Sequence, residues 1–401
     1  ADQRADIQFA IDYFTMRSEK YEVISELVQS KRTFVLTGYI LAKKADALKA
    51  ELEKRFDLAV ELADCDPAVD PPIMLQNNPF SAPVEGVLES FGLPGRGEVD
   101  PCTVMSVFYY VLFGLMLSDA AYGLLMVIGC GFALLKFKNM ESGMRKTLQM
   151  FFYCGISTTF WGFMFGSFFG DLVGVVATTF FGRPDIALGP IWFEPVKEPM
   201  RMLVFSMLMG IIHLFAGLAM KAYQYAKQKA WLDILYDVGF WYMLLAGLVV
   251  FALSNQMFVG ILQLSFILPV LAGTIGIAVA GIGAVGILLT AGRESRSPFK
   301  RLLKGAYGLY GVTGYLSDIL SYSRLLALGL ATGVIATVVN SMGSMLGGGI
   351  VGAIVFILVF FVGHTLNLAI NLLGAYVHTN RLQFVEFFGK FYEGGGRAFR
   401  P

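Results

Sequence analysis

Apolar runs separated by short charged segments fill the chain from about residue 104 onward. About 20 apolar residues in a helix span a hydrocarbon core of roughly 30 Å, and most of these runs are long enough to do so. The pattern predicts eight spans, at residues 104–118, 120–135, 148–170, 201–222, 232–253, 264–291, 308–340 and 349–388. We therefore predict a mainly α-helical, polytopic membrane domain over residues 101–401.

The last two spans are longer than one perpendicular crossing needs, which predicts long, tilted helices. Residues 104–136 are too long for one crossing and short for two, with Asp119 in the middle. Two crossings there place all basic clusters on one side, as the positive-inside rule requires. The clusters contain Lys136, Lys138, Arg145 and Lys146; Lys221, Lys227 and Lys229; Arg293, Arg296, Lys300, Arg301 and Lys304; and Lys390, Arg397 and Arg400. We therefore expect both termini to be cytoplasmic.

Residues 1–100 have the pattern of a water-exposed α+β segment. Apolar residues recur at helical spacing in the first part and alternate as in a strand afterwards. The predicted elements are an amphipathic helix over 1–30, a strand over 32–42, a helix over 46–55 and a strand over 58–62. Prolines and glycines over 67–83 and 92–101 then predict a linker to the membrane.

Composition supports the membrane assignment and excludes several functions. Hydrophobic residues make up 56% of the chain and charged residues only 15%, against roughly 25% charged in soluble domains. A net charge of +1 gives no electrostatic case for nucleic acid. The four cysteines lack C-x-x-C spacing, so we predict no metal or other cofactor. No G-x-x-x-x-G-K-[ST] motif occurs, so any nucleotide chemistry belongs to partner chains.

The seventh span contains an arginine deep in apolar sequence. Arg324 is followed by about four apolar helical turns, and an arginine at a helix centre costs on the order of 3 kcal/mol on the most lenient scale. Such a residue normally faces a partner or a water-filled cavity. The alternatives are a structural ion pair with Asp318 or Glu386, or an arginine that reaches the membrane interface.

The eighth span carries a polar stripe. His364, Asn367, Asn371 and His378 fall within an arc of roughly 60°, and Arg381 lies about 60° beyond His378. A stripe about four turns long suits the wall of a water-filled half-channel. The alternative is hydrogen bonding between helices, which explains one or two such residues more easily than all of them. We interpret His213, by contrast, as a packing residue, and we expect Asp119 and Asp171 to lie near the outer face, where water reaches them.

Four segments resemble one protein family. They are 85–101 (EGVLESFGLPGRGEVDP), 113–123 (FGLMLSDAAYG), 317–331 (SDILSYSRLLALGLA) and 380–396 (NRLQFVEFFGKFYEGGG). In this order they are similar to the motifs of the membrane subunit a of V-type and A-type rotary ATPases, called subunit I in prokaryotes. The resemblance covers about residues 85–401.

The resemblance implies a stator that faces a rotating ring of proteolipid subunits, each with a membrane carboxylate. Arg324 and Arg381 match the family's two membrane arginines. Two offset half-channels would be lined by Asp318, Ser321, His364, Asn367, Asn371, His378 and Glu386. Eukaryotic relatives carry a glutamate where this chain has Asn371, so a prokaryotic cell membrane is the expected location.

The same resemblance implies the partners. They are the proteolipid ring, peripheral-stalk subunits of the E and G type, membrane lipid and, indirectly, central-stalk subunit d and the ATP-hydrolysing head. Residues 1–100 would then be the C-terminal part of a cytoplasmic stator domain. The transported ion, H⁺ or Na⁺, stays open, because that choice depends mainly on the ring.

Two other functions compete with this one. A secondary ion-coupled transporter would show inverted repeats and helices broken at the midplane, and no repeat is visible between the halves of this chain. A non-transporting scaffold would use both arginines only in structural pairs. The long polar stripe argues against a scaffold.

Overall fold

The computed structural model describes residues 2–30, 32–66, 69–186, 189–263, 266–293 and 298–399. The chain divides into two compact units, Ala1–Pro72 and Ile73–Pro401. Each unit is described by itself.

The first unit is two helices joined by a very short hairpin. Helix α1 spans Asp2–Glu26, and α2 spans Ala42–Arg55. Between them, β1 (Val28–Gln29) pairs antiparallel with β2 (Phe34–Val35). The two predicted helices are thus present, although the first ends at Glu26 rather than at residue 30.

The predicted strands are largely wrong. Only Phe34–Val35 of the expected strand over 32–42 is a strand, and the described residues 58–62 form none. A two-stranded hairpin is marginal without further strands or a helix packed on it. Leu58 and Leu62 stay 40% and 44% exposed, so they provide no buried face for a third strand. This unit is therefore helical with little strand, not a β-α-β piece.

The second unit is helical, as predicted. Its helices are η1 (Ala82–Val84), α3 (Glu85–Phe91), α4 (Cys102–Leu117), α5 (Ala120–Lys136), α6 (Ser142–Phe165), α7 (Leu172–Phe181), α8 (Pro199–Lys227), α9 (Trp231–Ile234), η2 (Leu235–Gly239), α10 (Phe240–Ser254), α11 (Gln256–Ile261), α12 (Val270–Thr290), α13 (Pro298–Tyr310), α14 (Val312–Ser321), α15 (Ser323–Ser344), α16 (Ile350–Arg381), η3 (Leu382–Phe387) and η4 (Phe388–Lys390). The segments η2 and η3 are π-helical.

Five helical stretches among the described residues are long and apolar enough to cross a membrane. They are Pro199–Lys227, Trp231–Ser254, Val270–Thr290, Phe299–Ser344 and Ile350–Lys390. The last two contain 46 and 41 residues, which confirms the predicted long final pair. Helices α4, α5 and α7 are apolar but shorter. The chain is a multi-pass membrane protein.

Close helix packing depends on small residues. A Cβ added at Gly123 of α5 would lie 2.5 Å from Thr159 N of α6, and one at Gly283 of α12 would lie 2.7 Å from Leu244 N of α10. Without a hydrophobic force between helices in lipid, such close backbone contact is a main source of helix association. These glycines therefore hold two helix pairs together.

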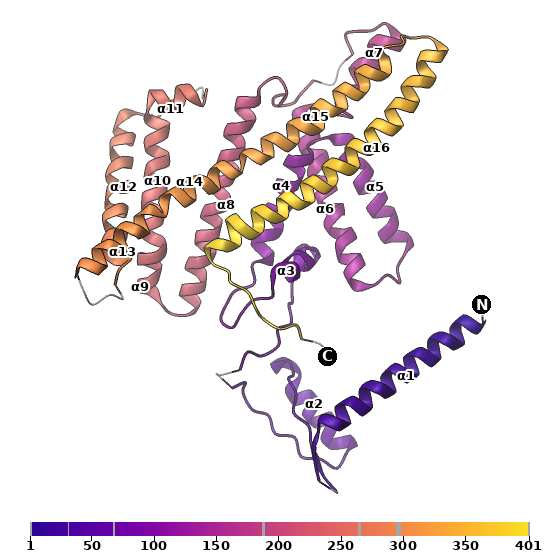
Figure 1. Cartoon of the computed structure of the whole chain (residues 1–401), viewed down its shortest axis with the longest axis vertical. Coiled ribbons are helices and arrows are strands. Elements are labelled where there is room, and N and C mark those ends of the chain that lie inside the picture. Colours follow the sequence, from indigo (N-terminus) through magenta and orange to yellow (C-terminus); the bar gives the residue numbers. More distant parts are fainter. Residues whose placement is uncertain are drawn as a thin grey trace. The chain divides into compact units, whose positions relative to one another are not determined.

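The two longest stretches cross the other helices obliquely. In Figure 1, α14 and α15 form one nearly straight line, and α16 runs beside α15, both at a slant to α8, α10 and α12. Helix α15 packs on α16, α4, α7 and α8. Single-residue interruptions at Gly311 and Tyr322 separate α13, α14 and α15. This arrangement places Arg324 and Arg381, the two arginines singled out from the sequence, on neighbouring helices.

Candidate functional site

The polar stripe of α16 divides into a buried part and a more exposed part. His364, Asn367 and Asn371 are only 3%, 2% and 5% exposed. Together with Tyr122 of α5 and Asn340 of α15 they form a hydrogen-bonded set that we call the amide network. The predicted stripe residues thus face other helices rather than lipid.

Hydrogen bonds in the amide network fix the tautomer of its histidine. Tyr122 OH accepts from Asn367 Nδ2 (2.9 Å) and lies 2.6 Å from His364 Nδ1. Because Asn340 Oδ1 can only accept, the neutral His364 ring carries its hydrogen on Nε2, which donates to that oxygen at 3.0 Å. Its Nδ1 then accepts from the Tyr122 hydroxyl. Asn371 Nδ2 donates to both the backbone and side-chain oxygens of Asn367, at 2.9 and 2.5 Å. Every ring nitrogen of this histidine is used.

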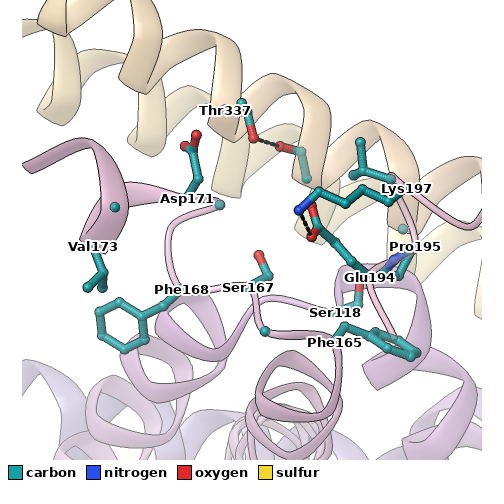
Figure 2. A pocket seen from close by; sticks show the side chains of 16 residues that line it. Ser118, Phe165, Ser167, Phe168, Asp171, Val173, Glu194, Pro195, Lys197 and Thr337 are labelled. Atoms are coloured by element: carbon teal, nitrogen blue, oxygen red, sulfur yellow. Dashed lines mark hydrogen bonds and ion pairs between the residues drawn. The ribbon is translucent and has the colours of Figure 1, made fainter. Parts of the chain in front are cut away.

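The amide network reaches a polar pocket through one aspartate. Asn340 Nδ2 donates to Asp171 Oδ1 at 2.9 Å. Asp171 lines a pocket of about 180 Å³, which is shown in Figure 2. In that view Asp171 and Thr337 lie across the pocket from the ion pair of Glu194 and Lys197. A pocket lined partly by charged side chains therefore adjoins the amide network.

Asp119 is not near water, contrary to the sequence expectation. Its side chain is 0% exposed, and it caps the N-terminus of α5 by accepting from Ala121 N and Tyr122 N. Its carboxylate also accepts from Ser167 Oγ at 2.6 Å and from Phe169 N and Gly170 N. Five donors satisfy it, so its role is to hold the α6–α7 loop against α5.

Arg324 is the second residue of α15, and Arg381 is the last residue of α16. Arg324 is half-buried and Arg381 is exposed, and they are close enough to affect each other electrostatically, as are Arg324 and Glu386. Among the described residues, no ion pair joins either arginine to a carboxylate, and Arg324 Nη1 is buried without a hydrogen-bond partner. We call Arg324 and Arg381 the arginine pair. The structural ion pairs considered from sequence are absent from the described chain.

His378 stands apart from the other stripe histidine. It is half-buried beside the arginine pair, which acts on it electrostatically, and its Nδ1 has no partner among the described residues. The four polar residues of the predicted stripe therefore do not form one group. His364, Asn367 and Asn371 belong to the amide network, whereas His378 lies beside the arginine pair.

A third group of polar residues lies where α14 meets η3 and η4. Asp318 of α14 pairs with Lys390 of η4 at 2.5 Å, and Lys390 lies 4.2 Å above the ring of Tyr315. Glu386 of η3 is 1% exposed and interacts with Ser321 and, electrostatically, with Asp318. We call Asp318, Ser321, Glu386 and Lys390 the acid cluster. The three residues predicted from this region are thus brought together.

Several residues of these sites were missed from the sequence. Tyr122 and Asn340 belong to the amide network, Lys390 completes the acid cluster, and Tyr322 lies 2.7 Å from His213 Nδ1. A polar residue inside an apolar span was the available signal for Asn340. No sequence signal distinguishes Tyr122 and Tyr322 from packing tyrosines, because their partners are more than a hundred residues away.

Comparisons with known proteins identify the family of the chain. A model of the V-type ATPase 116 kDa subunit family matches residues 9–183 and 311–401. The A-type ATP synthase subunit I of Methanocaldococcus jannaschii is 32% identical over 97% of this chain and 58% of its own length. The same subunit of Thermococcus kodakarensis is 28% identical over 99% and 58%. The V-type ATP synthase subunit I of Chlamydia trachomatis is 24% identical over 95% and 63%.

The chain belongs to the V-type ATPase 116 kDa subunit family, in which these relatives are called subunit I. It spans about 58% of the length of the first of them. The second segment matched by the family model, residues 311–401, contains both Arg324 and Arg381.

Proposed function

We propose that this chain is the ion-translocating stator of its complex and that it forms two offset half-channels against a rotating proteolipid ring. The observation that carries the proposal is the order of polar groups along the chain. Arg324 separates Asp318 and Ser321 from Asn340, and Arg381 separates Asn371 from Glu386, so each arginine falls between the acid cluster and the amide network. The arginine pair has no carboxylate partner among the described residues. An unpaired arginine at that depth is expensive unless a partner chain supplies the anion.

The arginine pair would drive ion release from the ring. A ring carboxylate that carries its ion is neutral and can move through lipid. When it meets Arg324, the cation favours the ionised carboxylate, and the ion leaves. A guanidinium suits this task because it stays charged at any working pH and meets a carboxylate with two hydrogen bonds. The same fixed charge prevents an ion from passing directly between the half-channels.

The amide network and the acid cluster would each form one half-channel. The pocket at Asp171 and the amide network would give access from the outer side, and the acid cluster would give access from the cytoplasm. Eight crossings with cytoplasmic termini fit this assignment, with α4, α5 and α6 as the first three. Each 100 mV of membrane potential supplies about 2.3 kcal/mol per charge moved, which rotation of the ring couples to ATP synthesis or hydrolysis in the head.

The proposed partners are supported by one exposed face of α16 and by the family resemblance. Arg381 shares one face of α16 with Leu366, Ile370, Leu373 and Val377, which are all more than half exposed. We assign this face to the proteolipid ring. Residues 1–100 would be the C-terminal part of the cytoplasmic stator domain, which binds peripheral-stalk subunits of the E and G type. Subunit d and the ATP-hydrolysing head would be reached only indirectly, in the cell membrane of a prokaryote.

A cross-linking experiment tests the ring-facing surface. We expect Val377→Cys, in a complex whose other cysteines have been replaced, to form cross-links to ring subunits that carry a cysteine beside their carboxylate. Leu125→Cys is the matched control, since Leu125 on α5 is 49% exposed and Val377 is 51% exposed. If Leu125→Cys forms these cross-links and Val377→Cys does not, the ring contacts α5 rather than this face of α16, and the proposal is contradicted.

A further inference from the structure

Helix α13 separates its apolar and basic side chains onto two adjoining faces. At 100° per residue, its large apolar side chains at the exposed positions fall within an arc of roughly 140°. They are Phe299, Leu302, Leu303, Tyr307 and Tyr310, and each of them is more than half exposed. The three basic side chains are also exposed and occupy the next arc of roughly 100°. They are Lys300, Arg301 and Lys304. The helix is therefore amphipathic, with both of these faces open.

A third face, made of glycines, holds α13 on the rest of the second unit. A Cβ added at Gly305 would collide with the backbone oxygen of Leu288 in α12, and one at Gly308 would lie 3.0 Å from the Ala291 Cβ. In Figure 1, α13 forms the end of the slanting line of α14 and α15, and it packs against α12. Because the glycine face makes this contact, the apolar and basic faces point away from α12.

The length of the helical stretch that begins with α13 places α13 at the membrane surface. Phe299–Ser344 contains 46 residues, whereas a helix tilted by 40° crosses a core of about 30 Å with roughly 26 residues. A large part of the stretch therefore lies outside the hydrocarbon. Three of its five charged residues are in α13, and charged side chains are costly in the core. The excess length is therefore best placed at the α13 end.

The three positive charges of α13 are not neutralised within the described part of the chain. None of Lys300, Arg301 and Lys304 forms an ion pair with a described carboxylate. Arg293, just after α12, is different, because it pairs with Asp233 at 2.8 Å and with Asp237 at 3.0 Å. A positive surface beside an exposed apolar surface thus remains on α13.

We propose that α13 is a binding surface for anionic phospholipid. Its apolar face enters the boundary between headgroups and acyl chains, and Lys300, Arg301 and Lys304 contact the lipid phosphates. Basic amphipathic helices bind membrane surfaces through buried apolar area together with attraction to anionic lipid. Charge complementarity selects this occupant, since an anionic phospholipid matches both faces, whereas an apolar protein surface would leave three cations unpaired. The proposal does not depend on the half-channels.

Quenching by brominated lipid tests which lipid contacts α13. Tyr307, which is 80% exposed, is replaced by cysteine in a complex whose other cysteines have been removed, and the thiol is labelled with a fluorophore. The complex is reconstituted in phosphatidylcholine vesicles that contain phosphatidylglycerol as a minor component, with bromine on the acyl chains of one lipid or the other. We expect quenching per lipid molecule to be at least about fivefold greater for brominated phosphatidylglycerol than for brominated phosphatidylcholine.

Two triple variants locate the source of this preference. Lys300→Gln, Arg301→Gln and Lys304→Gln together should bring the quenching ratio close to one. Lys136→Gln, Lys138→Gln and Arg145→Gln together are the matched control, because they remove the same charge from another exposed basic cluster and should leave the ratio unchanged. An equal loss in both triple variants would overturn the assignment to α13. Equal quenching by the two lipids in the unmodified complex would overturn the anionic preference, and no quenching by either would show that a partner subunit covers this face instead.

Discussion

We expect Arg324→Ala to abolish ion transport by the assembled complex. An opposite charge within about 4–6 Å changes the ionisation equilibrium of a carboxylate by about 10- to 1,000-fold. Without it, a loaded ring carboxylate keeps its ion, and the ring cannot deliver that ion to the exit half-channel. The measurement is ATP-driven ion uptake into vesicles, with ATP hydrolysis and subunit composition followed in the same preparation.

Two further variants separate charge from geometry. Arg324→Lys keeps a positive charge but loses the two-point contact with a carboxylate, so we expect partial transport. Arg381→Ala removes the exposed member of the arginine pair and should cause the smaller loss. If Arg324→Ala transports ions near the normal rate and Arg381→Ala is inactive, the release step belongs to Arg381, and its assignment to Arg324 is wrong.

The second large effect concerns the ion pair between α14 and η4. Asp318 and Lys390 lie 2.5 Å apart, and both are mostly buried. Asp318→Lys places two cations together, and breaking a buried pair costs about 3–5 kcal/mol. We expect this single variant to lose most transport, because η3 and the acid cluster depend on this contact.

The reciprocal exchange supplies the control. Asp318→Lys combined with Lys390→Asp restores opposite charges, so we expect the double variant to recover a large part of the transport lost by either single variant. Recovery should be incomplete, since Lys390 also loses its position above the Tyr315 ring. A double variant that is as inactive as Asp318→Lys would show that residue identity, rather than the pair, is what matters.

The sequence was sufficient to predict the long final helices. Twenty or more apolar residues in a row have one solution in lipid, so the long final stretches followed directly from hydropathy. Arg324 was found because a charge in that context is expensive. Asp318, Ser321 and Glu386, which were expected among the channel-lining residues, lie close to one another where α14 meets η3.

The partners of these residues were beyond the sequence. His364 bonds to Tyr122, which is 242 residues away, and nothing in a periodic pattern specifies such a contact. Asp119 was expected near the outer face, where water reaches it, yet backbone donors of a distant loop satisfy its carboxylate in the interior. The strands predicted over 32–42 and 58–62 were largely wrong for a related reason, because alternation predicts a strand only where further strands can pair with it.

Sided labelling tests the central claim most directly. In a complex with Cys65, Cys102, Cys130 and Cys154 replaced, a cysteine is placed at Ser321 in the acid cluster or at Thr337 in the Asp171 pocket. A membrane-impermeant thiol reagent is then added to one face of sealed vesicles at a time. Two offset half-channels predict that Ser321→Cys reacts only from the cytoplasmic face and Thr337→Cys only from the opposite face. Reaction of both from the same face would contradict the account.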